Sequence, residues 1–444
     1  MPSKWQYIQI GDLVASGEAS LQTGPFGSQL HKHDYVARGV AIIPTEAIGR
    51  GAIRQDASLP QISEVKAAEL RRHRLRQGDI LFARRGVQAT GLSAVVEASH
   101  EGALCGTGAI LLRVNHDVMD PYFLSAVLAT DQAYDWLRAH AVGAVMPNLN
   151  TGIISQLAVP RPSLKEQRSI ASTIQCLSRR IDLLRQTNAT LESIAQALFK
   201  SWFIDFDPVR AKAEGREPEG MDAATAALFP SEFEESAVGL IPKGWHATTV
   251  AEAVELNPPR SLSKGTDAPY LEMANASTIG HRPMERVGRR GFGSGCKFRN
   301  GDALLAKITP CLENGKSAFI DFLEDDEIGW GSTEFIVLRS KPVLPQYAAY
   351  LLARHEPFRQ FAIQAMTGTS GRQRVDLSRL AQFPLALPRD SSVAQGIDPM
   401  FRALQSRIAA NDEQAKNLGD LRDALLPRPA PVRFQPAGAR YRAR

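Results

Sequence analysis

The chain has 444 residues, of which 44% are hydrophobic and 22% charged, a composition typical of globular proteins with room for roughly two or three cores. With 52 Lys and Arg against 47 Asp and Glu, the net charge of +5 favours a polyanionic partner without establishing one. No apolar run approaches the roughly 18 residues of a membrane span, and the first residues lack the pattern of a secretion leader. We therefore expect a cytoplasmic protein with no membrane association.

Residues 1–160 mix short alternating apolar runs with Gly and Pro, which predicts a compact α/β domain. Residues 161–207 then predict one long helix. It opens with a capping box from Ser163 to Glu166, in which each side chain satisfies a backbone donor of the first turn. Counted from Leu177, apolar residues recur at heptad spacing, with the polar Asn188 in the seam. We expect Pro208 to end this helix, because proline disrupts a helix interior.

Residues 208–240 are polar and predict a linker with at most one short helix around residues 223–229. Residues 241–389 form a second domain, opened by a Pro-Lys-Gly-Trp segment that resembles the start of the chain. A second helix is expected over residues 390–427, with Pro427 at its end. Residues 428–444 carry five arginines and predict a disordered basic tail.

The two halves of the chain are repeats of one another. Gly-Asp-Ile-Leu-Phe-Ala-Arg at residues 78–84 returns as Gly-Asp-Ala-Leu-Leu-Ala-Lys at residues 301–307. The apolar heptad positions of residues 170–198 return without insertions at residues 397–425. A helix over residues 170–198 would be about 43 Å long at about 1.5 Å per residue, more than a domain of this size needs. We therefore predict that the two helices pair as an intramolecular coiled coil. The alternative is that each packs on its own domain, and the pairing direction stays open.

Several segments, taken in order, carry a family resemblance. Residues 197–209, Ala-Leu-Phe-Lys-Ser-Trp-Phe-Ile-Asp-Phe-Asp-Pro-Val, lie at the end of the first helix between the two variable domains. They resemble the central region of the specificity subunits of type I restriction-modification enzymes. The resemblance extends to further segments, which follow one another along the chain in the order typical of that family. They are residues 23–28, 78–84, 165–168, 301–307, 331–335 and 367–374.

The resemblance implies an α/β (α+β) fold with two target recognition domains separated by an antiparallel coiled coil, in pseudo-two-fold arrangement. It implies a non-catalytic subunit in which each domain reads one half of a bipartite, asymmetric site on double-stranded DNA. The expected partners are two methylation subunits and, further, restriction and translocase subunits. No cofactor is expected on this chain, because S-adenosylmethionine, ATP and Mg would bind to those partners.

Candidate DNA-binding residues lie where the Gly-Asp strands end and in one polar loop of each domain. Arginine suits guanine or phosphate, and Asn and Gln suit adenine, although a solvated strand end or surface loop explains the same residues. The candidates are Arg84, Arg85, Asn148, Asn150, Lys307, Thr369, Ser370, Arg372, Gln373 and Arg374.

An aromatic stripe closes the first helix. Most such stripes belong to a core, but the helix already uses its heptad seam, and the resemblance favours docking of a methylation subunit here. The candidate partner-binding residues are Phe199, Trp202, Phe203 and Phe206.

Two other functions remain as alternatives. Asn257-Pro258-Pro259-Arg260 resembles the adenine methyltransferase motif, but Arg260 stands where an aromatic residue should stack on the flipped base. The glycines of residues 291–295 and 315–317 match no complete cofactor or phosphate loop, and His31 and His33 have no further metal ligand nearby in the sequence. A coiled-coil adaptor without a DNA role is the other alternative.

Overall fold

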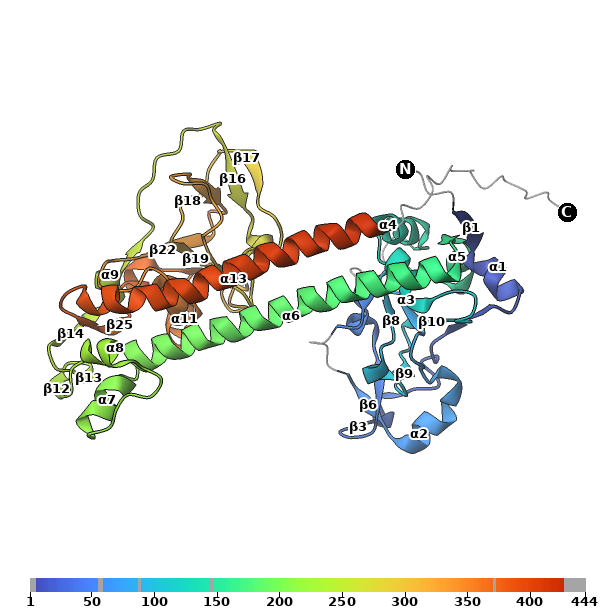
Figure 1. The fold of residues 1–444 in the computed structure, drawn as a ribbon, viewed down its shortest axis with the longest axis horizontal. Helices are drawn as coiled ribbons and strands as arrows, with labels where there is room; N and C mark the ends of the chain where they lie inside the picture. Colours follow the sequence, from blue (N-terminus) through green and yellow to red (C-terminus); the bar gives the residue numbers. More distant parts are fainter. Residues whose placement is uncertain (1–4, 55–58, 87–88, 144–146, 370–372, 427–444) are drawn as a thin grey trace. The chain divides into compact units, whose positions relative to one another are not determined.

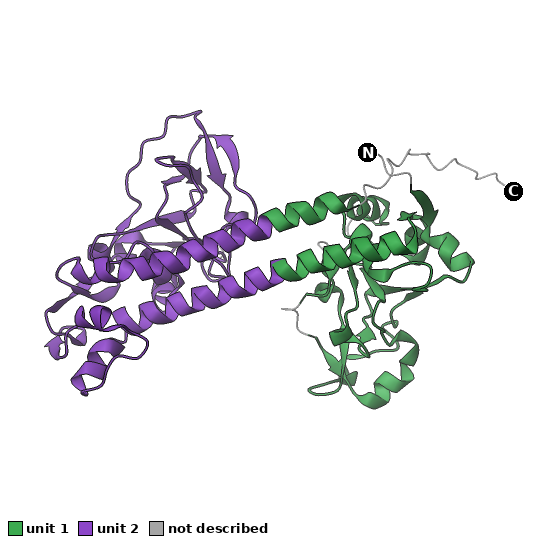
Figure 2. Ribbon diagram, viewed as in Figure 1, with its two compact units in different colours: residues 1–180, 417–444 green, residues 181–416 purple. Residues whose placement is uncertain are grey.

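The computed structural model describes residues 5–54, 59–86, 89–143, 147–369 and 373–426. The chain divides into two compact units, residues 1–180 with 417–444 and residues 181–416 (Figure 2). The division falls inside both long helices, so each unit combines a globular region with segments of both. None of the described helices has the length and apolar character needed to cross a membrane.

The first unit contains a five-stranded sheet, a four-stranded sheet and a two-stranded ribbon (Figure 1). The five-stranded sheet has the order β2 (Ala19–Thr23), β10 (Ala109–Val114), β7 (Ile80–Ala83), β8 (Ser93–Val95) and β5 (Gly51–Ala52). The four-stranded sheet has the order β3 (Tyr35–Val36), β6 (Gln61–Ile62), β4 (Val40–Ile43) and β9 (Leu104–Cys105), and the ribbon pairs β1 (Gln6–Gln9) with β11 (Ala158–Arg161). Its short helices are α1 (Ile10–Ala15), α2 (Glu64–Glu69), α3 (Pro121–Leu128), α4 (Asp131–His140) and α5 (Thr151–Gln156).

The second unit is built in the same way. One sheet has the order β15 (Val254–Leu256), β22 (Phe335–Ser340), β19 (Asp302–Ala306) and β20 (Ser317–Phe319). The other has the order β17 (Gly288–Gly291), β16 (Asp267–Leu271), β21 (Gly329–Gly331) and β18 (Cys296–Phe298). Three two-stranded ribbons among the described residues pair β14 (Trp245–Thr249) with β25 (Pro384–Pro388), β23 (Met366–Thr367) with β24 (Arg374–Val375), and β12 (Phe233–Ser236) with β13 (Gly239–Pro242). Its short helices include α9 (Val250–Ala253), α10 (Ala348–Arg354), α11 (Glu356–Gln364) and α12 (Leu377–Leu380).

The register of the strands confirms the repeat. The Gly-Asp strand β7 pairs antiparallel with β10, and β19 pairs antiparallel with β22 at the matching residues, Ala83 with Ala109 and Ala306 with Phe335. In the sheet of β3, β6, β4 and β9, strand β4 runs parallel to β9. In the sheet of β17, β16, β21 and β18, strand β16 likewise runs parallel to β21. The duplicated sequence therefore corresponds to a duplicated topology.

The Gly-Asp pair that opens β7 forms a closed turn. Gly78 has a φ of 88°, which favours glycine, and the Asp79 carboxylate accepts the backbone N–H of Arg76 at 2.7 Å. The buried carboxylate also binds the Arg113 guanidinium on the neighbouring strand β10, with two bonds of 2.7 and 2.6 Å. The acid thus holds the turn and aligns the two strands.

The second unit repeats this turn with one additional cation. Gly301 has a φ of 85°, and Asp302 accepts the backbone N–H of Arg299 at 2.8 Å. Asp302 also forms an ion pair with Arg339 on β22, the counterpart of Arg113. Arg260 adds a second guanidinium, 2.5 Å from the carboxylate, and both of these side chains are almost fully buried.

The first long helix is confirmed as one continuous element, α6 (Leu164–Phe203). The capping box is confirmed, since Ser163 N–H donates to Glu166 at 3.0 Å and Glu166 N–H donates to the Ser163 hydroxyl at 3.3 Å. The expectation that Pro208 ends the helix was wrong. The helix ends earlier, Phe206 has a left-handed φ of 57°, and Pro208 lies in the first turn of α7 (Asp207–Ala213). Proline is tolerated there because the first N–H groups of a helix have no intrahelical partner.

The second long helix, α13 (Ser392–Leu425), pairs with α6 within the second unit. The Asn188 amide donates to the Ile408 carbonyl at 3.2 Å and to Asp412 at 2.8 Å. Further along α6, the Trp202 ring lies 6.0 Å from the ring of Phe401. Residues further along α6 therefore contact residues earlier in α13. The coiled coil is confirmed, and its two helices are antiparallel.

The prediction for residues 208–240 was wrong, because this segment is folded. It contains most of α7, then α8 (Ala223–Ala227) and a hairpin of β12 (Phe233–Ser236) and β13 (Gly239–Pro242). Val209 and Phe229 are buried in the core of the second unit. A few apolar residues anchor the segment, although its average composition is polar. Residues 428–444, expected to form a basic tail, lie outside the described residues.

We predict unequal losses of stability when the two turn acids are neutralised. Asp302→Asn leaves two guanidinium groups opposite a neutral side chain, and removing one partner of a buried ion pair costs about 3–5 kcal/mol. Asp79→Asn leaves one guanidinium, Arg113, whose side chain is 28% exposed and can be hydrated. Denaturant unfolding should therefore place the midpoint of Asp302→Asn below that of Asp79→Asn. Equal midpoints would contradict this account.

Candidate nucleic-acid interface

In the first unit, the candidate residues meet at the end of β7. The backbone N–H of Leu149 donates to the Arg84 carbonyl at 2.8 Å, which holds the polar loop beside the strand end. The Arg84 Nε–H donates to the Asn148 amide oxygen at 2.9 Å, and the neighbouring Arg85 is exposed. Three of the four candidates thus form one cationic cluster. Within this cluster, Arg84 is bound by the uncharged side chain of Asn148, so its positive charge is not neutralised.

The fourth candidate of this unit has a structural role. The amide oxygen of Asn150 accepts the backbone N–H of Ile153 at 2.9 Å and caps α5. Asparagine is favoured at this position because its short side chain satisfies a free donor of the first turn. The side chain is exposed, but its oxygen is committed to the helix.

In the second unit, Lys307, Gln373 and Arg374 meet in the equivalent place. The backbone N–H of Val375 donates to the Lys307 carbonyl at 2.9 Å, and that of Thr309 donates to the Gln373 carbonyl at 3.2 Å. Thr369 is exposed nearby in the chain, whereas Ser370 and Arg372 lie outside the described residues. The strand end and the polar loop, far apart in sequence, are therefore adjacent in both units.

The two strand ends differ in charge. Arg374 donates to both carboxylate oxygens of Glu334, at 3.0 and 2.7 Å. These hydrogen bonds, followed by the positive charges of Arg374 and Lys307, lower the pKa of Glu334, so the pair stays ionised at neutral pH. In the first unit, Gly108 occupies the position of Glu334, because the backbone N–H groups of Arg84 and Lys307 donate to Gly108 and Glu334 respectively. Arg374 is thus partly neutralised, and Arg84 is not.

The aromatic stripe of α6 belongs to the core, which corrects the expectation of a partner-binding surface. Phe199, Trp202 and Phe203 are 2%, 4% and 2% exposed. The Trp202 ring packs 5.9 Å from Phe229, and the half-buried Phe206 lies 5.7 Å from the Trp245 ring. The heptad seam left this face free in the sequence, but the folded segment 208–240 and the second globular region cover it.

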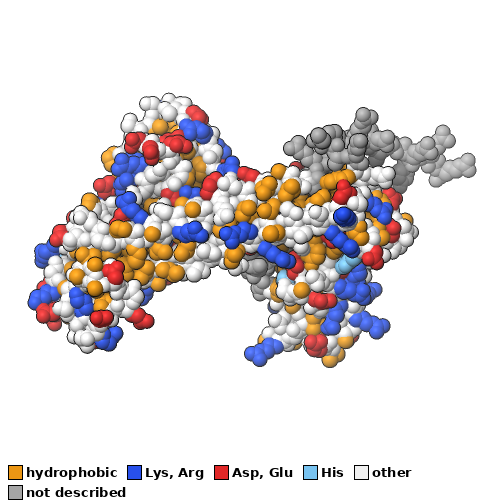
Figure 3. Space-filling model, viewed as in Figure 1, with side chains coloured by type: hydrophobic (Ala, Val, Ile, Leu, Met, Phe, Trp, Pro, Cys, Tyr) orange, Lys and Arg blue, Asp and Glu red, His pale blue; other side chains and the backbone are white. Residues whose placement is uncertain are grey.

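Other positions on the helices are exposed and apolar. On the face seen in Figure 3, hydrophobic side chains are interspersed along α6 and α13. On α6, Leu183 is 51% and Ile194 43% exposed. These residues, rather than the aromatic stripe, are available for contact with another chain.

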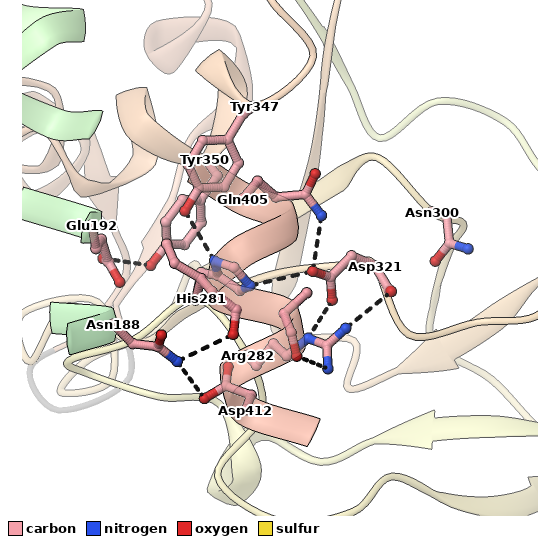
Figure 4. Close-up of polar contacts among 12 residues, drawn as sticks. Asn188, Glu192, His281, Arg282, Asn300, Asp321, Tyr347, Tyr350, Gln405 and Asp412 are labelled. Atoms are coloured by element: carbon pink, nitrogen blue, oxygen red, sulfur yellow. Dashed lines mark hydrogen bonds and ion pairs between the residues drawn. The ribbon is translucent and has the colours of Figure 1, made fainter. Parts of the chain in front are cut away.

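A buried polar network joins the long helices to the second globular region (Figure 4). The Tyr350 hydroxyl donates to Glu192 of α6 at 2.8 Å, and the Gln405 amide of α13 donates to Asp321 at 3.0 Å. His281 lies between the Tyr347 hydroxyl, at 3.0 Å, and Asp321, at 3.3 Å. Burial opposes ionisation of Asp321, but His281 and Arg282 outweigh it and lower its pKa. No motif marked these residues in the sequence.

The methyltransferase-like motif also has a structural role. The Asn257 amide oxygen accepts the backbone N–H of Val337 at 2.9 Å, and Arg260 is bound to Asp302. In the described part of the chain, no group of three or more His, Cys, Asp or Glu side chains is placed to hold a metal ion.

The comparisons with known proteins agree with this architecture. Residues 2–193 match the type I restriction modification DNA specificity domain. The chain is 24% identical over 417 residues to the type I restriction enzyme HindI specificity subunit of Haemophilus influenzae, covering 80% of this chain and 86% of that protein. It is 32% identical over 168 residues to the EcoAI specificity subunit of Escherichia coli, covering 36% and 28%. The type I restriction-modification S subunit of M. genitalium shares the fold, with a TM-score of 0.52, 14% identity and coverage of 96% and 95%.

These matches agree with the duplicated domains and the paired helices. Residues 2–193 therefore match the type I restriction modification DNA specificity domain, and most of the chain is similar to specificity subunits of type I restriction enzymes.

We predict that truncating a side chain of the aromatic stripe lowers the stability of the second unit rather than removing a surface contact. Trp202→Ala should lower the free energy of unfolding by about 3–5 kcal/mol, because it leaves a cavity in a packed core. Ile194→Ala, at an exposed position of the same helix, is the control and should change it by less than about 0.5 kcal/mol. Thermal unfolding of the full chain measures both. Unchanged stability of Trp202→Ala with loss of a partner would restore the docking interpretation.

Proposed function

We propose that this chain is a non-catalytic specificity subunit of a type I restriction-modification enzyme, and that each of its units reads one half of a bipartite, asymmetric DNA site. The strand-end clusters support this most directly. Each unit brings a basic residue at the end of its Gly-Asp strand, Arg84 or Lys307, next to the polar loop that follows the helices of that unit. Side chains of these types suit phosphate and base edges, and two similar but unequally charged clusters suit two different half-sites.

The long helices set the distance between the half-sites. Helix α6 has 40 residues, which corresponds to about 60 Å, and residues 164–180 and 181–203 belong to different units. One turn of B-DNA measures about 34–36 Å, so a rigid rod of this length can separate two readers by more than one turn. The Asn188 contacts inside the seam favour a single register of the pair.

Methylation subunits dock on this chain and carry out the chemistry. Exposed apolar positions such as Leu183 and Ile194 on α6 are suited to such contacts. S-adenosylmethionine would bind to these methylation subunits, and ATP and Mg to the restriction and translocase subunits. The complex acts on double-stranded DNA in the cytoplasm. A coiled-coil adaptor without a DNA role would instead not retard a DNA duplex at low salt.

We expect replacements at the two strand ends to affect different half-sites. Arg84→Gln should weaken binding of the full target by about tenfold or more, within the about 1–3 kcal/mol of a specific base contact. On a DNA probe in which the half-site read by the first unit is scrambled, Arg84→Gln should cause no further loss of affinity. Arg374→Gln should show the same behaviour for the other half, with a smaller loss, because Arg374 must leave Glu334.

The target for this test comes from methylome sequencing of cells that express the chain with its partner subunits. Arg216→Gln, on the exposed loop that follows α7, is the control and should bind as the unaltered chain does. If both strand-end variants lose affinity equally on either scrambled probe, the assignment of one half-site to each unit is wrong.

A matched insertion in the two helices tests the spacing role. Seven residues added after Arg180 in α6 and after Lys416 in α13 keep the heptad seam and lengthen the pair by about 10 Å. We expect the preferred gap between half-sites to grow by about three base pairs, with unchanged half-site sequences. Selection from DNA with randomised gap lengths measures this. A seven-residue insertion after Ala237, in the β12–β13 turn, is the control, and an unchanged gap in the helix variant would exclude the helices as the spacer.

A further inference from the structure

The second unit has a pocket of about 320 Å³ next to the end of β19. Its wall includes Lys307, Lys297 on β18 and Arg260, together with Thr333 and Cys296. Lys307 also belongs to the strand-end cluster beside Gln373 and Arg374. The pocket therefore adjoins the candidate nucleic-acid interface of this unit.

The pocket carries an excess of positive charge. Asp302 faces two guanidinium groups, those of Arg260 and Arg339, and one carboxylate balances only one of them. In the first unit, the equivalent Asp79 binds one arginine, Arg113. Arg113 pairs with Ser20 on β2, as Arg339 pairs with Glu255 on β15. Five residues after these partners, the first unit has Pro25 where the second has Arg260. The extra buried cation is thus a property of the second unit.

Hydrogen-bond donors on the pocket wall are left without acceptors. Arg260 is 6% exposed, and its Nε has no hydrogen-bond partner within the described residues. Lys307 makes no side-chain hydrogen bond or ion pair that the described part of the chain records. Among the residues that the structure describes, Lys297 donates only to the Arg260 carbonyl, at 3.1 Å, and it lies 4.9 Å from the Phe292 ring. A buried donor without an acceptor is unfavourable, which suggests that an acceptor enters from outside.

The remaining wall residues do not supply the missing negative charge. Burial raises the pKa of the Cys296 thiol to about 12, so it is neutral at pH 7. Glu334, which follows Thr333 in the chain, is half-buried and already bound by Arg374. The Thr333 hydroxyl offers one more donor. The site consists of three cations and a hydroxyl, a set that matches an oxyanion with several acceptor oxygens.

We propose that this pocket binds a phosphate group, and that its occupant in the assembled complex is a backbone phosphate of DNA. This inference rests on the proposed function. A phosphate held by Lys297, Lys307 and the free Nε–H of Arg260 positions the duplex against the polar loop without reading its sequence. It assigns Lys307 to positioning and leaves base contacts to the neighbouring loop.

The salt dependence of DNA binding tests the proposal. It is measured on the full-length chain in complex with its methylation subunits. For each phosphate that loses its cationic contact, the slope of log Kobs against log salt should fall by about 0.9. We expect this change in the double variant Lys297→Gln with Lys307→Gln, equally for target and unrelated DNA. Lys264→Gln, an exposed lysine that does not line the pocket, is the matched control and should keep the original slope.

A chemical scan of the DNA locates the contact. Single methylphosphonate substitutions remove one phosphate charge at a time. In the unaltered chain, one position in the half-site read by the second unit should lose affinity, and the double variant should be insensitive there. Arg260→Lys, which keeps a cation opposite Asp302 but lacks the Nε donor, should weaken the same position only. A circular dichroism spectrum and unfolding midpoint equal to those of the original chain establish that each variant is folded.

The outcomes separate this inference from the proposed function. If the unaltered complex does not bind DNA, the proposed function fails. If it binds DNA with a steep salt slope that the double variant retains, only the pocket assignment is overturned. Inorganic phosphate is the probe that tests whether the pocket takes free phosphate rather than a backbone phosphate of DNA. Loss of phosphate binding in the double variant, measured by calorimetry, with an unchanged DNA slope would mean that the pocket takes free phosphate, and would overturn the DNA assignment.

Discussion

The buried carboxylate at the start of each Gly-Asp strand is the interaction on which each globular region depends. Asp79 and Asp302 hold a glycine turn through a backbone N–H and bind an arginine on the adjacent strand. Since a slip of one residue would reverse the faces of a strand, this contact also determines which side chains reach the strand end. The positions of Arg84 and Lys307 follow from it.

The long helices are held by a different kind of contact. Apolar heptad residues such as Ile181, Leu184 and Ile408 are buried, while Asn188 and its partners on α13 favour one register. The network of Glu192, Tyr350, Asp321 and Gln405 then attaches the same helices to the second globular region. Such an attachment would keep the second globular region at a fixed place along the helices, as the proposed spacing role requires.

The candidate site was predictable where the signal was local or repeated. The repeated Gly-Asp strand marks Arg84 and Lys307 in the sequence, and polar composition marks the loops that the structure places beside them. Their contact with DNA stays a prediction. The roles of Asn150 and Arg374 were not predictable, because a cap and an ion pair depend on which backbone or acid lies nearby. In the sequence, Arg260 stands out only as a departure from a methyltransferase motif, since its partner Asp302 is 42 residues away.

By itself the sequence determined the duplicated α/β domains, the two long helices and their pairing, because periodicity and internal repeats are local properties of the chain. Only the tertiary structure decided that the pairing is antiparallel, that Trp202 and Phe203 are core residues, and that residues 208–240 are folded. These features depend on which surface is left uncovered once distant segments pack. An aromatic stripe has the same pattern in the sequence whether its own chain or another protein covers it.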